Sequence, residues 1–460
     1  MKNICKLLIP LAAALLVSCG GKTVLLFDGG GLSKWNVDGN VAVNDSIMTL
    51  SGYDARALLR SGYFDDFVLS MELRTTPGGK GALWFHTDKH FSGGYRVAIN
   101  NDHTDPCWWK MTGSLVSVRN ITNMFARDDQ WFKMDVRVEG RGITVTIDGR
   151  PVVEYTEPDE PYRTGINENA RLSSGKFNIV SSGTGEIQFR NISVVRLDGT
   201  VDKEAQLAKA IDERTDPIIR LHQEDFPVLD YHVHLKGGLT KEQAARQSRR
   251  LGINYAIAPN CGIGFAITND QDVAAYLDTM RNQPFISAMQ AEGREWLHTF
   301  SKEAREGFDF VFTDALTFTD DNRHRTRLWI PEETWIWNEQ EYMDMILDRI
   351  CRVLQEPVDV YVNPCFLPSP MDKKFDEFWT EARMDRFVAE LAKSGKALEI
   401  NELYRIPNKA IIKKAKAAAV KFTFGTNNVT PEVSNLEYSL KMKEECGLKA
   451  EDMYKPRIKL

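Results

Sequence analysis

His232 and His234 stand two residues apart at the end of an apolar stretch, residues 228–235, whose pattern predicts a buried strand. Side chains at positions i and i+2 of a strand point to the same side, so both imidazoles can approach one ion. Neutral imidazole is the commonest metal ligand, and Asp230 shares that face. The alternative is a pair of histidines that only form hydrogen bonds, because this spacing is weakly specific. The metal site is therefore a hypothesis that the rest of the chain has to support.

Short apolar segments alternate with amphipathic or charge-rich segments from residue 226 onward. This alternation predicts parallel strands joined by helical crossovers, and the absence of a polar face predicts strands that are covered on both sides. We expect seven strands, at residues 228–235, 255–259, 285–291, 308–313, 358–363, 397–401 and 421–424.

Seven such units with an H-x-H on the first strand resemble the PHP family, whose members are distorted seven-stranded barrels and often phosphoesterases. Residues 398–401, Ile406-Pro407 and residues 413–425 resemble the late part of that family. The resemblance implies an α/β barrel of the (βα)7 type over residues 226–460. The family binds up to three metals through further histidines and a closing Asp-x-His motif. At the corresponding positions this chain has Asn260, Asn363, Asn427 and Val429. Because asparagine and valine replace the ligands, the resemblance implies one ion at most.

Barrels of this kind carry their active sites at the carboxyl ends of the strands. We expect one divalent ion, Zn²⁺, Mn²⁺ or Fe²⁺, to act there as a Lewis acid, with His232, His234 and Glu292 as ligands and either Asp314 or Glu399 as a further one. The alternative is a barrel that holds no metal and binds a polyol through hydrogen bonds alone.

Catalytic and substrate-binding residues are expected at the same strand ends. Glu292 or Glu399 is the candidate general base where it is not a ligand, and Glu402 lies close to the second of these. Lys236 can bind an anionic group, although a solvated loop lysine is the alternative. The other expected substrate contacts are the strand-end amides Asn260, Asn363 and Asn427. The long fourth crossover, with Trp329, Trp335 and Trp337, is a candidate lid or a surface insertion.

The first part of the chain has the pattern of an all-β domain. Residues 67–74 and 132–139 alternate apolar and polar side chains, as half-buried strands do. Residues 143–147 and 152–155 flank Asp148-Gly149, a dipeptide typical of hairpin turns. Many short strands separated by turn residues indicate a sandwich.

Residues 26–35, LFDGGGLSKW, resemble the opening of the 3-keto-disaccharide hydrolase domain family, and later phrases such as Gly93-Gly-Tyr95 and residues 189–192 follow in order. The resemblance implies a concanavalin-like jelly-roll sandwich over residues 23–198. The family has a Glu-x-Gln-x-x-Asp run where this chain has Arg96, Ala98 and Asn101. These departures favour carbohydrate binding over the family's hydrolysis. Aromatic rings that can stack on a sugar, or alternatively fill the core, are Trp84, Tyr95 and Trp109.

The N-terminus resembles a bacterial lipoprotein signal, because a basic start and a short apolar run precede Leu16-Val-Ser-Cys19. We expect residues 1–19 to be that signal and Cys19 to carry lipid, which places the protein in the cell envelope, periplasmic or surface-exposed; an ordinary secretory signal or an anchor helix is the alternative. Residues 199–225 are expected to be a helical linker. The net charge of −6 argues against a nucleic-acid partner.

The sequence thus predicts a multidomain protein, an all-β sandwich followed by an α/β barrel, tethered to a membrane by lipid. The leading hypothesis is a carbohydrate-active hydrolase whose barrel acts with one metal and whose sandwich holds a glycan or glycoside. Two alternatives remain, a 3-keto-glycoside hydrolase that acts through the sandwich, and a carbohydrate-binding lipoprotein without catalysis.

Overall fold

The computed structural model describes residues 21–320 and 323–459, which form two compact units. The first unit contains the residues up to Arg96 together with Asp128–Asp159 and Ala170–Ala210. The second unit contains Val97–Arg127, Glu160–Asn169 and Ile211–Leu460. The sequence analysis treated residues 23–198 as one continuous domain, and the structure differs by assigning two internal segments to the second unit. The expected lipidation site, Cys19, lies outside the described residues.

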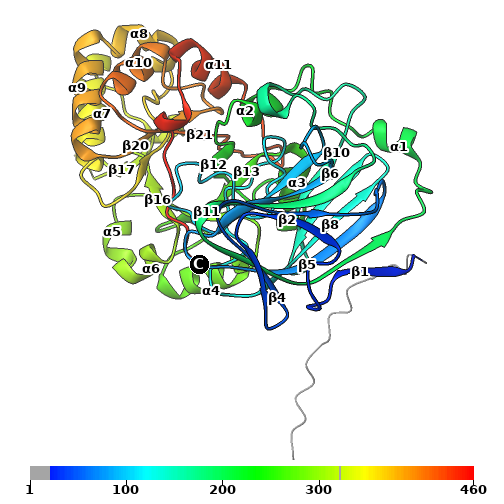
Figure 1. The fold of residues 1–460 in the computed structure, drawn as a ribbon. Coiled ribbons are helices and arrows are strands. Elements are labelled where there is room, and N and C mark those ends of the chain that lie inside the picture. The colour runs from blue at the N-terminus through cyan, green and yellow to red at the C-terminus, as the bar shows by residue number, and fades with distance from the viewer. Residues whose placement is uncertain (1–20, 321–322, 460) are drawn as a thin grey trace, which may run out of the picture. The chain divides into compact units, whose positions relative to one another are not determined.

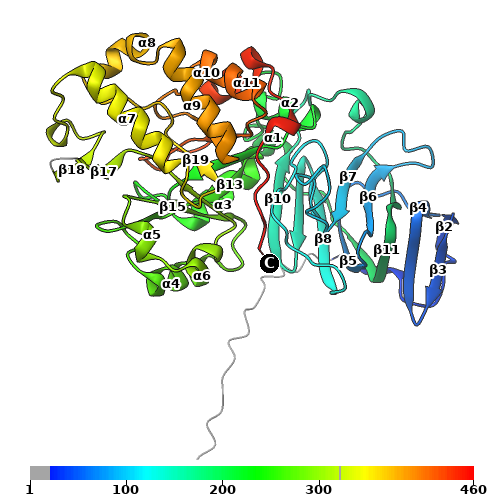
Figure 2. The same cartoon turned by 90° about the vertical axis from the view of Figure 1, so that its left-hand side faces the viewer.

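The first unit is a β-sandwich of antiparallel strands (Figures 1 and 2). Its main path runs in the order β10-β9-β8-β5-β11-β4-β2. The side chains of β5 alternate strictly between buried and half-buried, which confirms the pattern seen in the sequence. The strands of this sheet are β1 (Thr23–Phe27), β2 (Trp35–Asp38), β3 (Val41–Asn44), β4 (Ile47–Leu59), β5 (Phe67–Thr75), β6 (Lys80–Thr87), β7 (Tyr95–Asn100), β8 (Phe132–Glu139), β9 (Gly142–Ile147), β10 (Arg150–Thr156) and β11 (Lys176–Arg196). The boundary between the two units falls within β7, after Arg96.

The hairpin between β9 and β10 follows the expected chemistry. Asp148 and Gly149 have φ values of 47° and 78°, and Ile147 pairs directly with Arg150. Positive φ at both central residues is the geometry of a type I′ turn, which glycine adopts without a steric penalty. The short helix α1 (Lys203–Leu207) also belongs to the first unit, and Asp202 caps its start.

The second unit contains a closed parallel barrel of seven strands, in the order β13-β12-β21-β20-β19-β16-β15, and β15 pairs back onto β13. Each expected strand overlaps one of them, so the predicted α/β barrel is confirmed. A two-residue strand, β14 (Asn260–Cys261), extends the sheet beside β15. The barrel strands are β12 (Leu229–Val233), β13 (Asn254–Ile257), β15 (Ile286–Ala291), β16 (Phe310–Thr313), β19 (Val360–Tyr361), β20 (Ala397–Asn401) and β21 (Phe422–Gly425).

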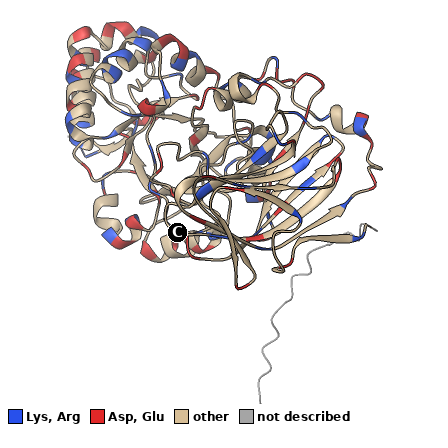
Figure 3. Ribbon diagram, in the orientation of Figure 1, with Lys and Arg blue, Asp and Glu red and all other residues tan. Residues whose placement is uncertain are grey.

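Amphipathic helices lie outside these strands, and Lys, Arg, Asp and Glu lie along α7, α9 and α10 (Figures 1 and 3). α3 shows why such segments begin and end where they do: Thr240 and Gln243 form a capping box, and Gly252, with φ 74°, terminates the helix. The helices are α2 (Pro217–Gln223), α3 (Lys241–Leu251), α4 (Asp270–Met280), α5 (Trp296–Thr299), α6 (Lys302–Glu306), α7 (Glu339–Val353), α8 (Phe375–Phe378), α9 (Glu381–Ser394), α10 (Lys409–Ala417) and α11 (Glu437–Cys446).

Val97–Arg127 belongs to the second unit because its side chains complete that unit's core. Trp108 and Trp109 are 4% and 6% exposed and pack in the barrel's hydrophobic cluster. Asn254, at the start of β13, accepts a hydrogen bond from Thr122 N at 3.1 Å and donates one to Asn120 O at 3.0 Å. These contacts hold the segment in the second unit, whereas the family resemblance of residues 23–198 runs through it.

Across the residues that the structure describes, no helix is long and apolar enough to cross a membrane. The expected linker, residues 199–225, divides between the units near Ile211. Its second half forms α2, which starts at Pro217 and is capped by Asp216.

Candidate active site in the barrel

The two histidines of β12 point their Nε2 atoms at each other across 3.1 Å. Each side chain is 1% exposed. Their other ring nitrogens are both engaged: His232 Nδ1 donates to Glu399 Oε1 at 2.6 Å, and His234 Nδ1 donates to the Ala258 carbonyl at 2.6 Å. A carbonyl can only accept, so the hydrogen-bond network assigns the His234 proton to Nδ1 and leaves a lone pair on Nε2. Burial also holds the pKa of His234 well below its ordinary value, so that ring is neutral.

Glu399, on β20, orients His232 and is itself held on every side. Its second oxygen accepts from Asn363 N at 2.7 Å and from Asn401 Nδ2 at 2.9 Å. The Glu399 side chain is 1% exposed. A carboxylate with all these donors is suited to fixing an imidazole, and it lies on the ring edge of His232 opposite to the paired Nε2 atoms.

The expected substrate-binding amides of two strand ends form a network behind Glu399. Asn363 Oδ1 accepts from Asn401 Nδ2 at 3.0 Å and from Asn427 Nδ2 at 2.9 Å. Asn363 Nδ2 donates to Asp314 Oδ2 at 2.8 Å. Asn363 and Asn427 both have a φ of 49°, a left-handed conformation that asparagine tolerates better than most residues. Such conformations concentrate at functional sites.

Glu292 lies at the end of β15 with one oxygen in use and one without a partner. Asn260 Nδ2 donates to Glu292 Oε1 at 2.6 Å and to Gln290 Oε1 at 2.9 Å. Glu292 Oε2 is buried and has no hydrogen-bond partner. Burial, reinforced by the nearby Asp314 carboxylate, raises the pKa of Glu292 to about 8. The protonated form therefore predominates at neutral pH, and this carboxyl can donate a proton.

Gln290 is a site residue that the sequence analysis did not identify. Its Oε1 lies 3.2 Å from His232 Nε2, and it is 4% exposed. It stands two residues before Glu292, so the same i, i+2 argument that was applied to the histidines places it on the same side of β15. A polar residue within an otherwise apolar predicted strand was the available signal.

Lys236 and Asp314 border the same group of side chains. Burial lowers the pKa of Lys236, and the charge of Glu292 opposes that shift. Asp314 accepts from Leu316 N at 2.9 Å besides Asn363, and burial raises the pKa of its carboxyl. Asp230 accepts from Thr426 N at 3.0 Å and from His232 N at 3.2 Å, so its carboxylate joins β12 to the segment after β21.

The donor set that converges here consists of His232 Nε2, His234 Nε2 and Gln290 Oε1. Two nitrogen ligands of one tetrahedral ion lie about 3.4 Å apart when each bond is about 2.1 Å, close to the spacing of these two nitrogens. In residues 21–320 and 323–459, no group of three His, Cys, Asp and Glu side chains is arranged to hold a metal. Of the predicted ligands, Glu292 and Asp314 instead accept hydrogen bonds from the side-chain amides of Asn260 and Asn363.

The aromatic residues expected to bind sugar are largely covered. The Arg96 guanidinium lies 5.1 Å above the Trp84 ring, and Phe91 packs edge-on against that ring. Tyr95 is 1% exposed and donates to Glu157. Trp109 belongs to the core of the second unit, as described above.

The tryptophans of the fourth crossover are exposed to solvent instead. Trp329, Trp335 and Trp337 are 37%, 48% and 59% exposed. They follow a small hairpin of β17 (Thr317–Thr319) and β18 (Arg325–Arg327), and the rings of His324 and Trp335 lie 4.3 Å apart. Whether they act as a lid stays a prediction.

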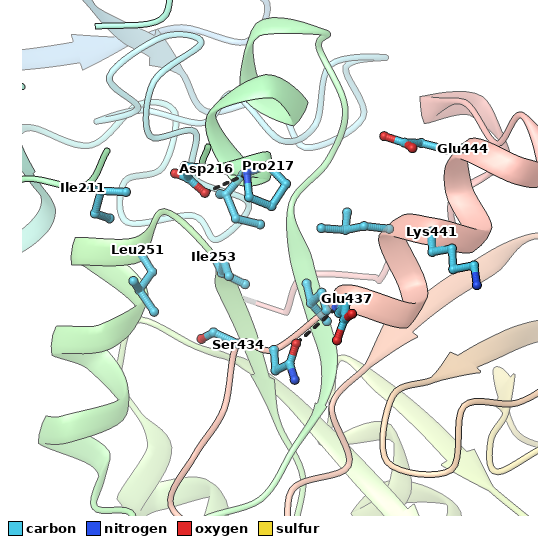
Figure 4. Close-up of a pocket in the computed structure, with 13 residues that line it drawn as sticks. Ile211, Asp216, Pro217, Leu251, Ile253, Ser434, Glu437, Lys441 and Glu444 are labelled. Atoms are coloured by element: carbon cyan, nitrogen blue, oxygen red, sulfur yellow. Dashed lines mark hydrogen bonds between the residues drawn. The ribbon is translucent and has the colours of Figure 1, made fainter. Parts of the chain in front are cut away.

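An apolar cavity of about 530 Å³ lies elsewhere in the second unit, between α3 and α11 (Figure 4). Ile218, Leu251 and Leu440 form part of its wall. Asp216 Oδ2 is buried there without a partner. Its lining residues include no nucleophile and base in hydrogen-bond contact.

Comparison with known families concerns the first unit. Residues 22–195 match the family model of the 3-keto-alpha-glucoside-1,2-lyase-like domain. This segment is a 3-keto-disaccharide hydrolase-like domain. The resemblance seen in the sequence is thereby confirmed for the sandwich, while the PHP resemblance of the barrel stays a prediction.

Several solved structures are similar to part of the chain. A predicted glycosyl hydrolase from Parabacteroides distasonis is 15% identical and aligns with 39% of this chain and 95% of its own, with a TM-score of 0.35. The carbohydrate-binding module CBM66 from Bacillus subtilis is 16% identical over 36% of this chain and 96% of its own, with a TM-score of 0.28. The exoplasmic domain of VIP36 with bound Ca²⁺ and Man3GlcNAc is 14% identical over 42% of this chain and 94% of its own, with a TM-score of 0.28. No curated protein matches the chain.

Proposed function

We propose that this protein is a carbohydrate-active hydrolase in which the barrel performs the chemistry and the sandwich binds the glycan or glycoside. The observation that carries the proposal is the pair of buried imidazoles whose Nε2 atoms converge while Glu399 and the Ala258 carbonyl fix both Nδ1 atoms. Metal-binding histidines characteristically donate their second N–H to such partners. The family of the sandwich supports a carbohydrate as the substrate class.

A divalent ion held by His232, His234 and Gln290 would polarise a substrate oxygen or a water molecule. Glu292 is the group that moves a proton. Because its pKa is raised to about 8, it is protonated at neutral pH and can donate to the leaving-group oxygen. Lys236, an exposed residue whose pKa is influenced by the charge of Glu292, can hold an anionic or hydroxyl group of the substrate.

The proposal also places the protein in the bacterial cell envelope, tethered through lipid on Cys19. The lipobox-like sequence supports this, and mass spectrometry of the N-terminal peptide from membranes tests it. A diacylated or triacylated Cys19 is expected; recovery of an uncleaved Met1 terminus would contradict the anchor.

The test of the barrel chemistry is elemental analysis of the purified full chain beside the His232→Ala/His234→Ala variant. We expect about one transition-metal ion per chain in the wild type and none in the variant. His298→Ala, on an exposed side chain of α5, is the matched control and should retain the ion. Equal metal content in all three proteins would sink the proposal.

A second candidate function is hydrolysis of a 3-keto-glycoside by the first unit. Only the family match of the sandwich favours it. The same variants distinguish it. Activity of the full chain on 3-keto-disaccharides that persists in His232→Ala/His234→Ala would assign the chemistry to the sandwich. Loss of all glycoside turnover in that variant, with its melting temperature unchanged, would assign it to the barrel.

A further inference from the structure

A second cavity, of about 240 Å³, lies between the segment that follows β16 and the last turns of α7. Three guanidinium groups and one carboxylate line it, those of Arg294, Arg349, Arg352 and Glu356. Arginine presents several N–H donors in a planar fork that matches the oxygens of phosphate, sulfate and carboxylate groups. The excess of arginine makes the cavity suited to an anion.

The single carboxylate of this cavity already has partners. Glu356 Oε1 accepts from Arg294 NH1 at 2.7 Å, and Glu356 Oε2 accepts from Trp296 Nε1 at 2.9 Å. Both oxygens of the acid are thus occupied, and its charge offsets that of Arg294.

Arg294 is held in place by neutral acceptors on its other side. Arg294 NH2 donates to Thr313 Oγ1 at 3.0 Å and to the Asp314 carbonyl at 2.9 Å, while its Nε is buried and has no partner. Arg349 stacks on Phe318, with its guanidinium carbon 4.2 Å from the ring centroid. Two of the guanidinium groups are therefore positioned before any ligand arrives, which reduces the entropy lost on binding.

Two further groups have hydrogen-bonding capacity to spare. Arg352 is exposed and lines the mouth of the cavity, so its guanidinium can turn toward a ligand. Thr317 is 1% exposed, lines the cavity, and has a buried hydroxyl without a partner. A buried hydroxyl that forms no hydrogen bond is costly, and a ligand oxygen would satisfy it.

We infer that this cavity is a binding site for the oxyanion group of a small molecule, a phosphate or sulfate, held by the three arginines and the Thr317 hydroxyl. Its volume lies just below the range of roughly 300–1,000 Å³ that is typical of small-molecule pockets, which suits a phosphate or sulfate ester of monosaccharide size. The site is separate from the histidine pair, because neither histidine nor Gln290 lines it. It does not depend on the proposed hydrolysis.

The experiment is isothermal titration of the full chain with inorganic phosphate and with inorganic sulfate, at constant ionic strength set by sodium chloride. Glucose 6-phosphate and galactose 6-sulfate are titrated beside them. Saturable binding of one ion per chain is expected. Tighter binding of an ester than of its free ion would assign the site to sugar esters, and equal affinity would assign it to the free ion.

Variants decide whether the cavity is the site. Arg352→Gln should raise the dissociation constant at least tenfold, and Thr317→Val should raise it several-fold without lowering the melting temperature, since the hydroxyl it removes has no partner. Arg281→Gln, an exposed arginine paired with Asp278, is the matched loss of charge and should bind as the wild type does. His232→Ala/His234→Ala should also bind unchanged. Absence of saturable binding, or equal loss in Arg281→Gln and Arg352→Gln, would overturn the inference.

Discussion

Glu399 accepts the Nδ1 proton of His232 at 2.6 Å, and this contact joins the last third of the barrel to its first strand across 167 residues of sequence. The sequence made Glu399 a candidate general base, and this contact instead gives it the role of orienting His232. The distinction has consequences that can be measured.

Replacing Glu399 with Gln should weaken metal binding about 10- to 100-fold, because the partner that fixes the His232 tautomer is lost. Competition with a chromogenic chelator measures this affinity. Glu402→Gln is the control: Glu402 accepts from Tyr438 N at 2.8 Å and Ser439 N at 3.1 Å, so its loss should lower the melting temperature and leave the metal affinity unchanged. If both variants bind metal as the wild type does, Glu399 does not orient a ligand.

Activity should fall as the pH rises through the pKa of Glu292, which burial raises above its ordinary value, since Glu292 acts in its protonated form. Glu292→Gln should lose about 10²- to 10⁴-fold in kcat, the usual contribution of a general acid. A pH profile of kcat that stays flat from pH 6 to pH 10 in the wild type would contradict the assignment.

The raised pKa of Glu292 also makes the stability of the folded protein depend on pH. Its pKa in the folded protein is about 8 against 4.5 as the ordinary value, so the folded state holds a proton that the unfolded state releases between these limits. Stability from this group is present below pH 4.5 and is lost as the pH rises through 8. Glu292→Gln should therefore melt at a higher temperature than the wild type at pH 8 to 9, with the difference shrinking toward pH 5.

His222 should make the barrel unit sensitive to acid. It is fully buried, its Nε2 donates to Gly252 O at 2.8 Å, and burial together with the charge of Arg119 lowers its pKa to about 3. Below the ordinary pKa of 6.5 the unfolded chain takes up a proton that the folded chain refuses, so stability falls by about 1.4 kcal/mol per pH unit toward pH 3. His222→Gln, which keeps a donor for Gly252, should flatten that slope in urea titrations between pH 6 and pH 4. His298→Gln should not.

Unfolding experiments can test whether Trp109 is a core residue or a sugar-binding one. Trp109→Ala should lower the free energy of unfolding by about 3–5 kcal/mol, the usual result for a buried tryptophan. Trp337→Ala removes the same ring from a position that is 59% exposed and should cost far less. Urea denaturation of both variants checks this; equal losses would place Trp109 at the surface.

Much of the fold follows from local patterns. The seven barrel strands, the Asp148-Gly149 hairpin and the sandwich were all predictable, because hydrophobic period and turn residues act over a few positions. The membership of Val97–Arg127 was not, since it depends on contacts such as that between Asn123 and Phe285, 162 residues apart.

The candidate site was likewise predictable only in part. The i, i+2 spacing correctly brought His232 and His234 together, because a strand fixes the direction of its side chains. The roles of Glu399, Asn363 and Asn427 could not be read from sequence. Their side chains turn toward one another behind the histidine, and only the closure of the barrel decides whether a strand-end amide meets substrate or another amide.

The placement of Val97–Arg127 governs the order in which this chain can fold. Asn120 is synthesised 134 residues ahead of its partner Asn254. At about 5–20 residues per second, that gap corresponds to roughly 7–27 s. During that interval Trp108 and Trp109 have no core to enter, so the nascent sandwich carries two large apolar side chains that a chaperone can bind. Expression hosts and export routes that shorten this exposure should give the higher yields, and a chain truncated after residue 198 should aggregate through this loop.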